Sequence, residues 1–348
     1  MSGGVDSSVA AALLVEAGHE VVGATLRLWG GASDSGCCSV ADVDDARRVA
    51  QRLGVDHHVF NYAEEFERRV VTPYVEGHAA GRTPNPCIEC NRHIKFDVLV
   101  ERARRLGFDA VSTGHHARVS ERGGRYFLLR GADSRKDQSY VLGYLTESQL
   151  SRLLLPIGAM TKDEVRAHGE RLGLRTWNKP DSQDVCFIEA SRGREAFLRD
   201  RLTPTPASIV DRATGEVIGQ VEVAEAITVG QRRGVAPGRD GERRYVARVD
   251  LVARRVEVDR LSAVTVSRLD LDATSLTFAR EVVTDGSRVL AQWSAHGAAV
   301  PATLHGGGRW WLETATPVRP VAAGQSVVFY APDEPAMVMG AALVEEST

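Results

Sequence analysis

The first residues of the chain have the composition of a phosphate-binding loop: Ser2-Gly3-Gly4-Val5-Asp6-Ser7-Ser8. Two glycines let the backbone approach an anion closely, and serine hydroxyls with N–H groups at a helix start can bind phosphate oxygens. The Gly-Lys-Ser ending of a Walker loop is missing, so the string does not predict γ-phosphoryl transfer. Asp6 is a candidate Mg²⁺ ligand, since a carboxylate together with phosphate oxygens suits that ion.

Two cysteines, Cys87 and Cys90, lie in a second segment with chemical potential, residues 83–96 (TPNPCIECNRHIKF). The segment puts a cysteine at the predicted start of a helix, where the helix dipole and the nearby Arg92 and Lys95 favour thiolate over thiol. A Cys-x-x-Cys pair could instead be half of a zinc or iron–sulfur site, although no second pair follows at finger spacing. Redox or sulfur-transfer chemistry, metal binding and a plain structural role therefore stay open at this point.

A further thiol, Cys186, follows a polar, turn-prone stretch in residues 179–188 (KPDSQDVCFI). Taken alone it reads as an ordinary buried cysteine. The chain has five cysteines, the other two being the vicinal Cys37 and Cys38, which read as small packing residues. An odd number with no secretory leader indicates metal or thiol chemistry rather than a secreted disulfide framework.

Alternating helix-like and strand-like segments position these residues. Helices are predicted over 7–17, 40–53 and 94–106, and strands over 20–29, 56–60 and 109–113. This alternation implies a parallel α/β sheet with crossover helices on both faces. The phosphate loop begins at residue 1, whereas such a loop normally follows a buried strand, so we expect the true start of the chain, with that strand, to lie upstream.

From Pro204 onward, short strand-like runs separated by Gly, Pro and Asp replace the helical periodicity. The predicted strands cover 208–210, 244–249, 256–258, 274–278 and 326–330. The predicted division is a catalytic α/β domain at 1–203, a small central β domain at 204–268 and a C-terminal β-barrel at 269–348.

Composition sets the class of protein. The 348 residues are 43% hydrophobic and 26% charged, as in an ordinary globular chain. No apolar run approaches the roughly 18 to 20 residues of a membrane span, so the expected compartment is the cytoplasm. The net charge of -3 means that a nucleic-acid binder of this composition must gather its positive charge on one surface. The densest basic stretch holds Arg232, Arg233, Arg239, Arg243 and Arg244, for which we predict phosphate clamping over the alternative of a solvated loop.

Lysine is rare and occurs only at Lys95, Lys136, Lys162 and Lys179. Lys95 lies in residues 83–96, Lys136 in the stretch KDQSYVL and Lys179 in residues 179–188, whereas Lys162 lies in none of these motifs.

The ordered set of motifs resembles the tRNA-specific 2-thiouridylases, the family called MnmA or TrmU, within the PP-loop ATP pyrophosphatases. The resemblance runs nearly end to end through SGGVDSS, TPNPCIECNRHIKF, STGHHAR, KDQSYVL, SQDVCFI, TVGQRRGV and GQSVVFY. It implies a PP-loop α/β domain followed by two small β-rich domains. It also implies that ATP adenylates O2 of the wobble uridine of a tRNA and that a cysteine persulfide then delivers sulfur to C2.

Site residues follow from the resemblance. Cys90 and Cys186 would be catalytic, with Cys186 carrying the persulfide and a transient Cys90–Cys186 disulfide as product. ATP would be bound by Ser2, Gly3, Gly4, Val5, Asp6, Ser7, Ser8, Leu26 and Gly114. The target base or tRNA would be contacted by Asn85, Pro86, Cys87, His115, Lys136, Asp137, Gln138 and Gln325.

The chain departs from the family pattern in several places. Cys87 replaces a common aspartate, which leaves its role open between proton exchange, an extra disulfide and a cluster ligand. Leu26 stands where a methionine usually packs on adenine. A histidine expected before TVGQRRGV is missing at 219–223, and Gln292-Trp293 replaces a common Arg-Tyr pair.

The resemblance also implies the partners: tRNA for Lys, Glu and Gln, a cysteine desulfurase or sulfur-relay protein as persulfide donor, and a monomeric enzyme. Mg²⁺ would accompany ATP, and an iron–sulfur cluster on the three thiols is the disfavoured alternative to direct sulfur exchange. Two other functions stay open, a PP-loop ligase or amidotransferase acting on a metabolite and a tRNA-binding or redox-sensing protein without ATPase activity.

Overall fold

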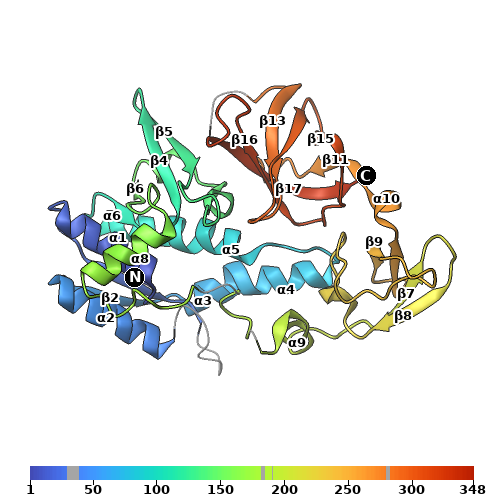
Figure 1. Ribbon diagram of the computed structural model, residues 1–348, viewed down its shortest axis with the longest axis horizontal. Helices are drawn as coiled ribbons and strands as arrows, with labels where there is room; N and C mark the ends of the chain where they lie inside the picture. Colours follow the sequence, from blue (N-terminus) through green and yellow to red (C-terminus); the bar gives the residue numbers. More distant parts are fainter. Residues whose placement is uncertain (30–38, 182–184, 190, 280–282) are drawn as a thin grey trace. The chain divides into compact units, whose positions relative to one another are not determined.

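The computed structural model describes residues 1–29, 39–181, 185–189, 191–279 and 283–348. Cys37, Cys38 and residues 182–184 of the SQD stretch lie outside these ranges. The chain divides into two compact units (Figure 1). The first unit comprises 1–71, 86–190 and 334–339, and the second comprises 72–85, 191–333 and 340–348. None of the described helices is both long enough and apolar enough to cross a membrane.

The first unit mixes helices with short parallel strand pairs. Strand β1 (Gly23–Arg27) pairs in parallel with β2 (His57–Asn61), and β3 (Val111–Ser112) pairs in parallel with β6 (Leu153–Leu154). A hairpin of β4 (Ala117–Arg122) and β5 (Arg125–Arg130) completes its strands in the described ranges. The helices are α1 (Val5–Glu16), α2 (Val40–Leu53), α3 (Ala63–Phe66), α5 (Pro86–Glu89), α6 (Leu99–Arg105), α7 (Glu147–Leu150) and α8 (Lys162–Arg171). Two π-helical segments, η1 (Glu67–Val71) and η2 (Cys90–Val98), and a 3₁₀ turn, η3 (Ser139–Leu142), join them.

Local sequence explains where several of these helices begin and end. The Ser39 hydroxyl accepts the Asp42 N–H at the start of α2, and Gly54 ends the helix in the left-handed region at φ 70°. Thr161 and Glu164 form a reciprocal capping box that starts α8. Helices α1 and α8 pack together through Val5, Val9 and Val165 in one core cluster. The core therefore fixes the N-terminus of α1, where the phosphate loop lies, against α8.

The second unit contains two β structures. A four-stranded sheet has the order β8-β7-β10-β9, from β7 (Ala207–Asp211), β8 (Val217–Val221), β9 (Tyr245–Asp250) and β10 (Arg255–Asp259). Strands β11 (Val266–Leu271), β15 (Trp310–Val318), β14 (Val300–His305), β13 (Ser287–Gln292), β16 (Ser326–Tyr330) and β17 (Val338–Ser347) pair in that order, and β17 returns to β11. This closes a six-stranded barrel, drawn in orange to red in Figure 1. Strand β12 (Thr277–Phe278) pairs with Gly340 and Ala341, near the start of β17.

Short helices complete the second unit: α4 (Thr72–Ala79), α9 (Gly193–Arg199), α10 (Leu261–Val264) and a 3₁₀ turn, η4 (Ala224–Ala226). Strand predictions were accurate for β7, β9, β10 and β16. The predicted strand at 274–278 is wrong over most of its length. Residues 273–275 form a turn that the Asp272 side chain stabilises, and the longer strand, β11, precedes it.

His78 on α4 is a buried imidazole with a lowered pKa. Its side chain is fully buried, Nδ1 donates to the Glu225 carbonyl at 2.8 Å, and Nε2 has no partner in the part of the chain that the structure describes. Burial lowers the pKa of His78 to about 4, and the bond to Glu225 only partly offsets this effect.

We therefore expect the free energy of unfolding to fall between about pH 6.5 and pH 4, because there the unfolded chain binds a proton that the folded imidazole does not. The loss approaches about 3 kcal/mol at the acid end and vanishes above pH 7. Urea unfolding at pH 7.5 and 5.0 measures it, and His78→Gln should show a smaller difference between the two pH values. An equal difference in the wild type and the variant would contradict this assignment.

Candidate active site around the phosphate loop

The predicted phosphate loop is a tight turn into α1. Gly4 is the N-cap and, having no side chain, leaves the first N–H groups of the helix without a side-chain cap. Gly3 has φ +71°, and a Cβ at this position would collide with the backbone of Asp42, so only glycine fits. The Ser2 N–H donates to Ser7 Oγ at 3.0 Å, and the two hydroxyls lie 3.2 Å apart. Ser8 is fully buried and donates to the Gly4 carbonyl at 2.8 Å.

Gly114 lies directly against this loop. A Cβ on Gly114 would come within 2.5 Å of the Asp6 carbonyl carbon and the Ser7 nitrogen. The turn after β3 therefore contacts the backbone of the phosphate loop. Leu26, the predicted adenine contact, is half-buried on β1.

The Asp6 carboxylate is bound by a buried lysine. Lys162 Nζ lies 2.7 and 2.8 Å from the two Asp6 oxygens and 2.7 Å from Asp181 Oδ1, and the residue is only 5% exposed. Burial raises the pKa of Asp6, but hydrogen bonds from His116 and Lys162 outweigh it, so the pKa lies below the ordinary value. Lys136 Nζ binds the other oxygen of Asp181 at 2.8 Å. The result is a continuous chain of alternating charges from the phosphate loop to the segment before Cys186.

Lys162 lies in none of the sequence motifs, and only its contacts with Asp6 and Asp181 identify it as a site residue. It is one of only four lysines in a chain whose other basic residues are arginines. That scarcity is the signal that could have found it. Lys179 has a similar position, because its Nζ donates to the Gly3 carbonyl at 3.1 Å and to Asp42 and Asp45 at 2.6 and 2.9 Å. Burial lowers the pKa of Lys179, but these carboxylates raise it above the usual value, so the lysine is charged.

The two histidines beside Gly114 differ in environment. His115 is 8% exposed, its Nδ1 lies 2.7 Å from Thr113 Oγ1, and burial together with the charge of Lys95 holds its pKa well below the usual value. It is therefore neutral at pH 7. His116 Nε2 lies 3.3 Å from Asp6 Oδ1. The backbone N–H of His116 donates to Gln138 Oε1 at 2.9 Å.

The predicted tRNA contacts of residues 136–138 already have partners within the first unit. Asp137 accepts from Arg130 at 2.7 Å, from the N–H of Gly131 at 2.9 Å and from Ser139. Gln138 is bonded to the backbone of His116. These side chains therefore hold the turn after β3 through bonds within the protein. A contact with RNA would have to form in addition to these bonds.

Both predicted catalytic cysteines belong to the first unit. A helical segment starts at Pro86, a residue that suits the first position of a helix. Cys87 in its first turn is exposed, whereas Cys90 one turn later is 7% exposed and begins η2. The expectation that the helix starts at 94 is wrong, because residues 90–98 form a π-helical segment that continues α5.

A chain of contacts links the segments of the two cysteines. Phe187, next to Cys186, packs edge-on against Phe66 of α3 with ring centroids 5.7 Å apart, and α3 contacts η2. Phe96 of η2 lies against His115 with ring centroids 5.8 Å apart. The helix that carries Cys90 is therefore connected both to the segment of Cys186 and to the turn beside the phosphate loop.

The described side chains include no group of three or more Cys, His, Asp or Glu arranged to hold a metal ion. Cys87, Cys90 and Cys186 all belong to the described part. Since both oxygens of Asp6 contact Lys162, the donor set around the phosphate loop does not fit a protein-held Mg²⁺.

Two predicted tRNA-contacting residues lie in the second unit. Gln325 Nε2 donates to the Thr83 carbonyl at 2.7 Å, and the Thr83 N–H donates to the Ala323 carbonyl at 2.7 Å. Residues 82–84 are thereby attached to the loop between β15 and β16. Asn85 is the last residue of this segment, and the first unit resumes at Pro86.

One expectation for the basic stretch is wrong. Arg244 is 3% exposed and pairs with Asp211 at 2.8 Å and with Asp240 at 2.9 Å. A buried arginine between two carboxylates stabilises the four-stranded sheet and is not available to clamp a phosphate. Arg239 is exposed and pairs with Glu216 at 3.0 Å.

An α/β unit with a glycine phosphate loop at the N-terminus of α1, followed by β domains, defines a nucleotide-binding protein of the HUP class. The tRNA methyl transferase HUP domain model matches residues 1–190, and the tRNA methyl transferase PRC-barrel domain model matches residues 195–260. The chain is 44% identical to a tRNA-specific 2-thiouridylase MnmA of Salinispora arenicola, over 99% of this chain and 97% of that protein.

Other relatives agree. Proteins of the same name from Mycobacteroides abscessus and Acidothermus cellulolyticus are 44% and 45% identical, over 99% and 95% of this chain and 98% and 93% of their own lengths. The chain belongs to the tRNA-specific 2-thiouridylase family.

Proposed function

We propose that this protein converts the wobble uridine of tRNA to 2-thiouridine, using ATP to activate the base and a cysteine persulfide as sulfur source. The observation that carries the proposal is the presence in one compact unit of an anion-binding helix start and of two thiols connected to it through α3, η2 and His115. Full-length similarity to relatives named for this activity supports it.

The chemistry has two parts. The C2 carbonyl of uridine is a poor electrophile and oxide is a poor leaving group. Attack of uridine O2 on the α-phosphate of ATP forms an O2–P bond, breaks the α–β bond and releases pyrophosphate. The uncapped N–H groups of α1 and the charges of Lys162 and Lys179 would stabilise the phosphates in this step.

Sulfur transfer follows. The terminal sulfur of a Cys186 persulfide attacks C2, and AMP departs with the original oxygen. The Cys90 thiolate then attacks the Cys186 sulfur, breaks the S–S bond and leaves both electrons on the transferred sulfur. The product is 2-thiouridine with a Cys90–Cys186 disulfide, which an external thiol reductant reopens.

Other parts of the site are assigned on the same basis. Ser2, Gly3, Gly4, Val5, Asp6, Ser7, Ser8, Leu26 and Gly114 would surround ATP. Asn85, Pro86, Cys87, His115, Lys136, Asp137, Gln138 and Gln325 would meet the base or the tRNA. Because a stacked anticodon base is out of reach of the thiols, the uridine would be flipped out. Mg²⁺ would arrive with the nucleotide, held largely by phosphate oxygens.

We further propose that the protein is a cytoplasmic monomer with three domains at 1–203, 204–268 and 269–348. Its substrates would be tRNAs for Lys, Glu and Gln, and a cysteine desulfurase or sulfur-relay protein would be the sulfur donor.

The direct test is nucleoside mass spectrometry of tRNA after incubation with the protein, ATP and a persulfide source. We expect 2-thiouridine and stoichiometric AMP. ATP–pyrophosphate exchange that needs a small metabolite and no tRNA would favour the ligase alternative. Binding of tRNA with no AMP release would favour a protein without catalysis.

A further inference from the structure

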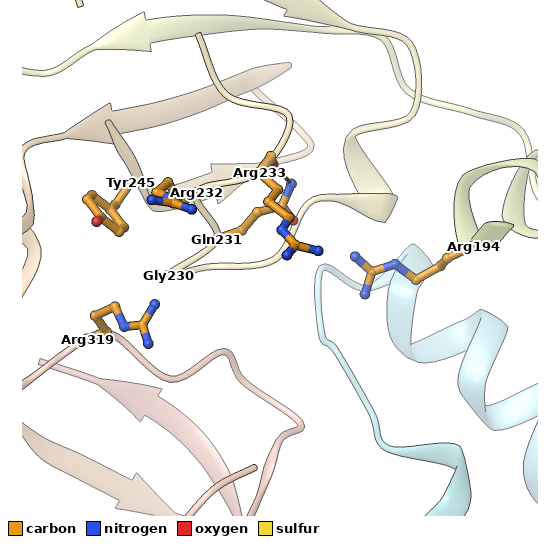
Figure 2. A pocket seen from close by; sticks show the side chains of 7 residues that line it. All are labelled: Arg194, Gly230, Gln231, Arg232, Arg233, Tyr245 and Arg319. Carbon is orange, nitrogen blue, oxygen red and sulfur yellow. Dashed lines mark hydrogen bonds between the residues drawn. The ribbon is translucent and has the colours of Figure 1, made fainter. Parts of the chain in front are cut away.

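The second unit contains a hollow of about 670 Å³ whose wall holds Arg194, Arg232, Arg233, Arg319 and Tyr245 (Figure 2). These side chains come from three separate parts of the chain: helix α9, the segment that leads into β9, and the loop between β15 and β16. The lining contains no carboxylate. Four guanidinium groups therefore converge on one open space from segments far apart in the sequence.

The backbone beneath these arginines is held in place by Gln231. Its Oε1 accepts from the Thr228 N–H at 3.0 Å, and its Nε2 donates to the Arg233 carbonyl at 2.7 Å. The backbone of residues 230 and 231 also bonds to Val246 of β9 at 2.8 and 2.9 Å. The turn is therefore fixed before any ligand arrives.

Gly230 joins this turn to the barrel loop. It has φ +81°, and a Cβ there would lie 2.5 Å from the Pro320 carbonyl oxygen. This close backbone approach brings Arg319, next to Pro320, to the same hollow as Arg232 and Arg233.

The arginines of the hollow differ from those around them in their pairing. In the described ranges no carboxylate lies within salt-bridge distance of Arg232, Arg233 or Arg319, and Arg194 donates to the Ala226 carbonyl at 2.9 Å. Some other arginines of the same unit are neutralised, as Arg239 by Glu216 and Arg260 by Asp240 and Glu242. A protein with net charge -3 thus gathers four arginines, with no lining carboxylate, at one hollow.

We propose that the hollow binds consecutive backbone phosphates of an RNA strand, distant in sequence from the phosphate loop. The proposal rests on the proposed function, which makes tRNA the polyanion. Arginine forks match phosphate geometry, and four of them exceed what one small phosphate neutralises. Phosphate contacts of this kind position a nucleic-acid strand and carry no sequence information directly.

The test is the salt dependence of tRNA binding by the full-length protein. For Arg232→Ala/Arg233→Ala we expect the slope of log Kd against log salt to become shallower by about 1.5 to 2, and Kd at 0.1 M salt to rise roughly 10- to 50-fold. Arg319→Ala, on a different segment, should lower the slope by about 1. Arg288→Ala is the matched control, since it removes an exposed barrel arginine on β13 outside the hollow and should leave slope and affinity unchanged.

Every outcome bears on the assignment. Unchanged slopes in both hollow variants would overturn it, as would an equal change in Arg288→Ala. Inorganic phosphate is the second probe. If it bound the wild type and not the double variant while tRNA binding stayed the same, the hollow would be a small-anion site. Formation of 2-thiouridine should persist in Arg288→Ala. A wild-type protein that makes no 2-thiouridine would refute the proposed function. A shallower salt slope in the hollow variants tests only the role of the hollow in tRNA binding.

Discussion

Replacing Cys186 by serine is expected to lower the rate of 2-thiouridine formation at least about a thousandfold, because a hydroxyl cannot carry the sulfur that attacks C2. Cys90→Ser should lose net turnover to a similar extent, since the Cys186 persulfide then has no resolving thiol. The two variants differ in one readout. After incubation with a labelled persulfide donor, Cys90→Ser should hold label on Cys186, and Cys186→Ser should hold none.

Adenylation provides the control for these thiol variants. Both should bind tRNA with near wild-type affinity and should release pyrophosphate in the first turnover, because the phosphate loop is untouched. Iron content gives a further check, since a cluster mechanism would place iron on the wild-type protein and remove it from both variants. If either variant made 2-thiouridine at the wild-type rate, the assigned roles would be wrong.

Lys162→Met is expected to slow AMP formation by roughly 10²- to 10³-fold, an effect typical of the loss of a charged group from a preorganised site. The side chain is 5% exposed and contacts both oxygens of Asp6 and one of Asp181. Without its charge Asp6 loses its lysine partner and Asp181 keeps only Lys136 and Arg166, so the ionic link between the phosphate loop and the segment before Cys186 is lost.

The pH profile distinguishes this positioning role from a merely structural one. Bonds from Lys162 help to depress the pKa values of both Asp6 and Asp181. In Lys162→Met both pKa values rise, so the acid limb of the rate profile should move to higher pH. Lys162→Arg should recover part of the rate and most of the profile.

The matched control for Lys162 is Arg171→Gln on the same helix. Arg171 pairs with Glu16 at 3.0 Å, and both side chains are substantially exposed, so the loss should be small. Thermal unfolding of each variant measures how much of the effect is stability. A Lys162→Met protein with normal AMP release and an unshifted profile would refute the coupling.

Much of the local structure was readable from sequence. Helix α2 coincides with its prediction at 40–53, since Ser39 and Gly54 are strong start and stop signals. Strand β16 coincides at 326–330 because its valines and aromatic residues favour a strand and turn residues bound it. The start of the Cys90 helix was misplaced, because a π-helical segment has no sequence signal and the true start at Pro86 lies in a proline-rich stretch.

By itself the sequence determined the glycine loop, the candidate thiols, the order of α/β and β regions and the family. These depend on residue type and short spacing, which chain order preserves. Only the tertiary structure decided which charges are compensated. It placed Lys162 on Asp6 across 156 residues, buried Arg244 between two aspartates and gathered Arg194, Arg232, Arg233 and Arg319 at one hollow. The physical reason is that electrostatic partners are set by distance in space, and no local pattern encodes a contact between residues so far apart in the chain.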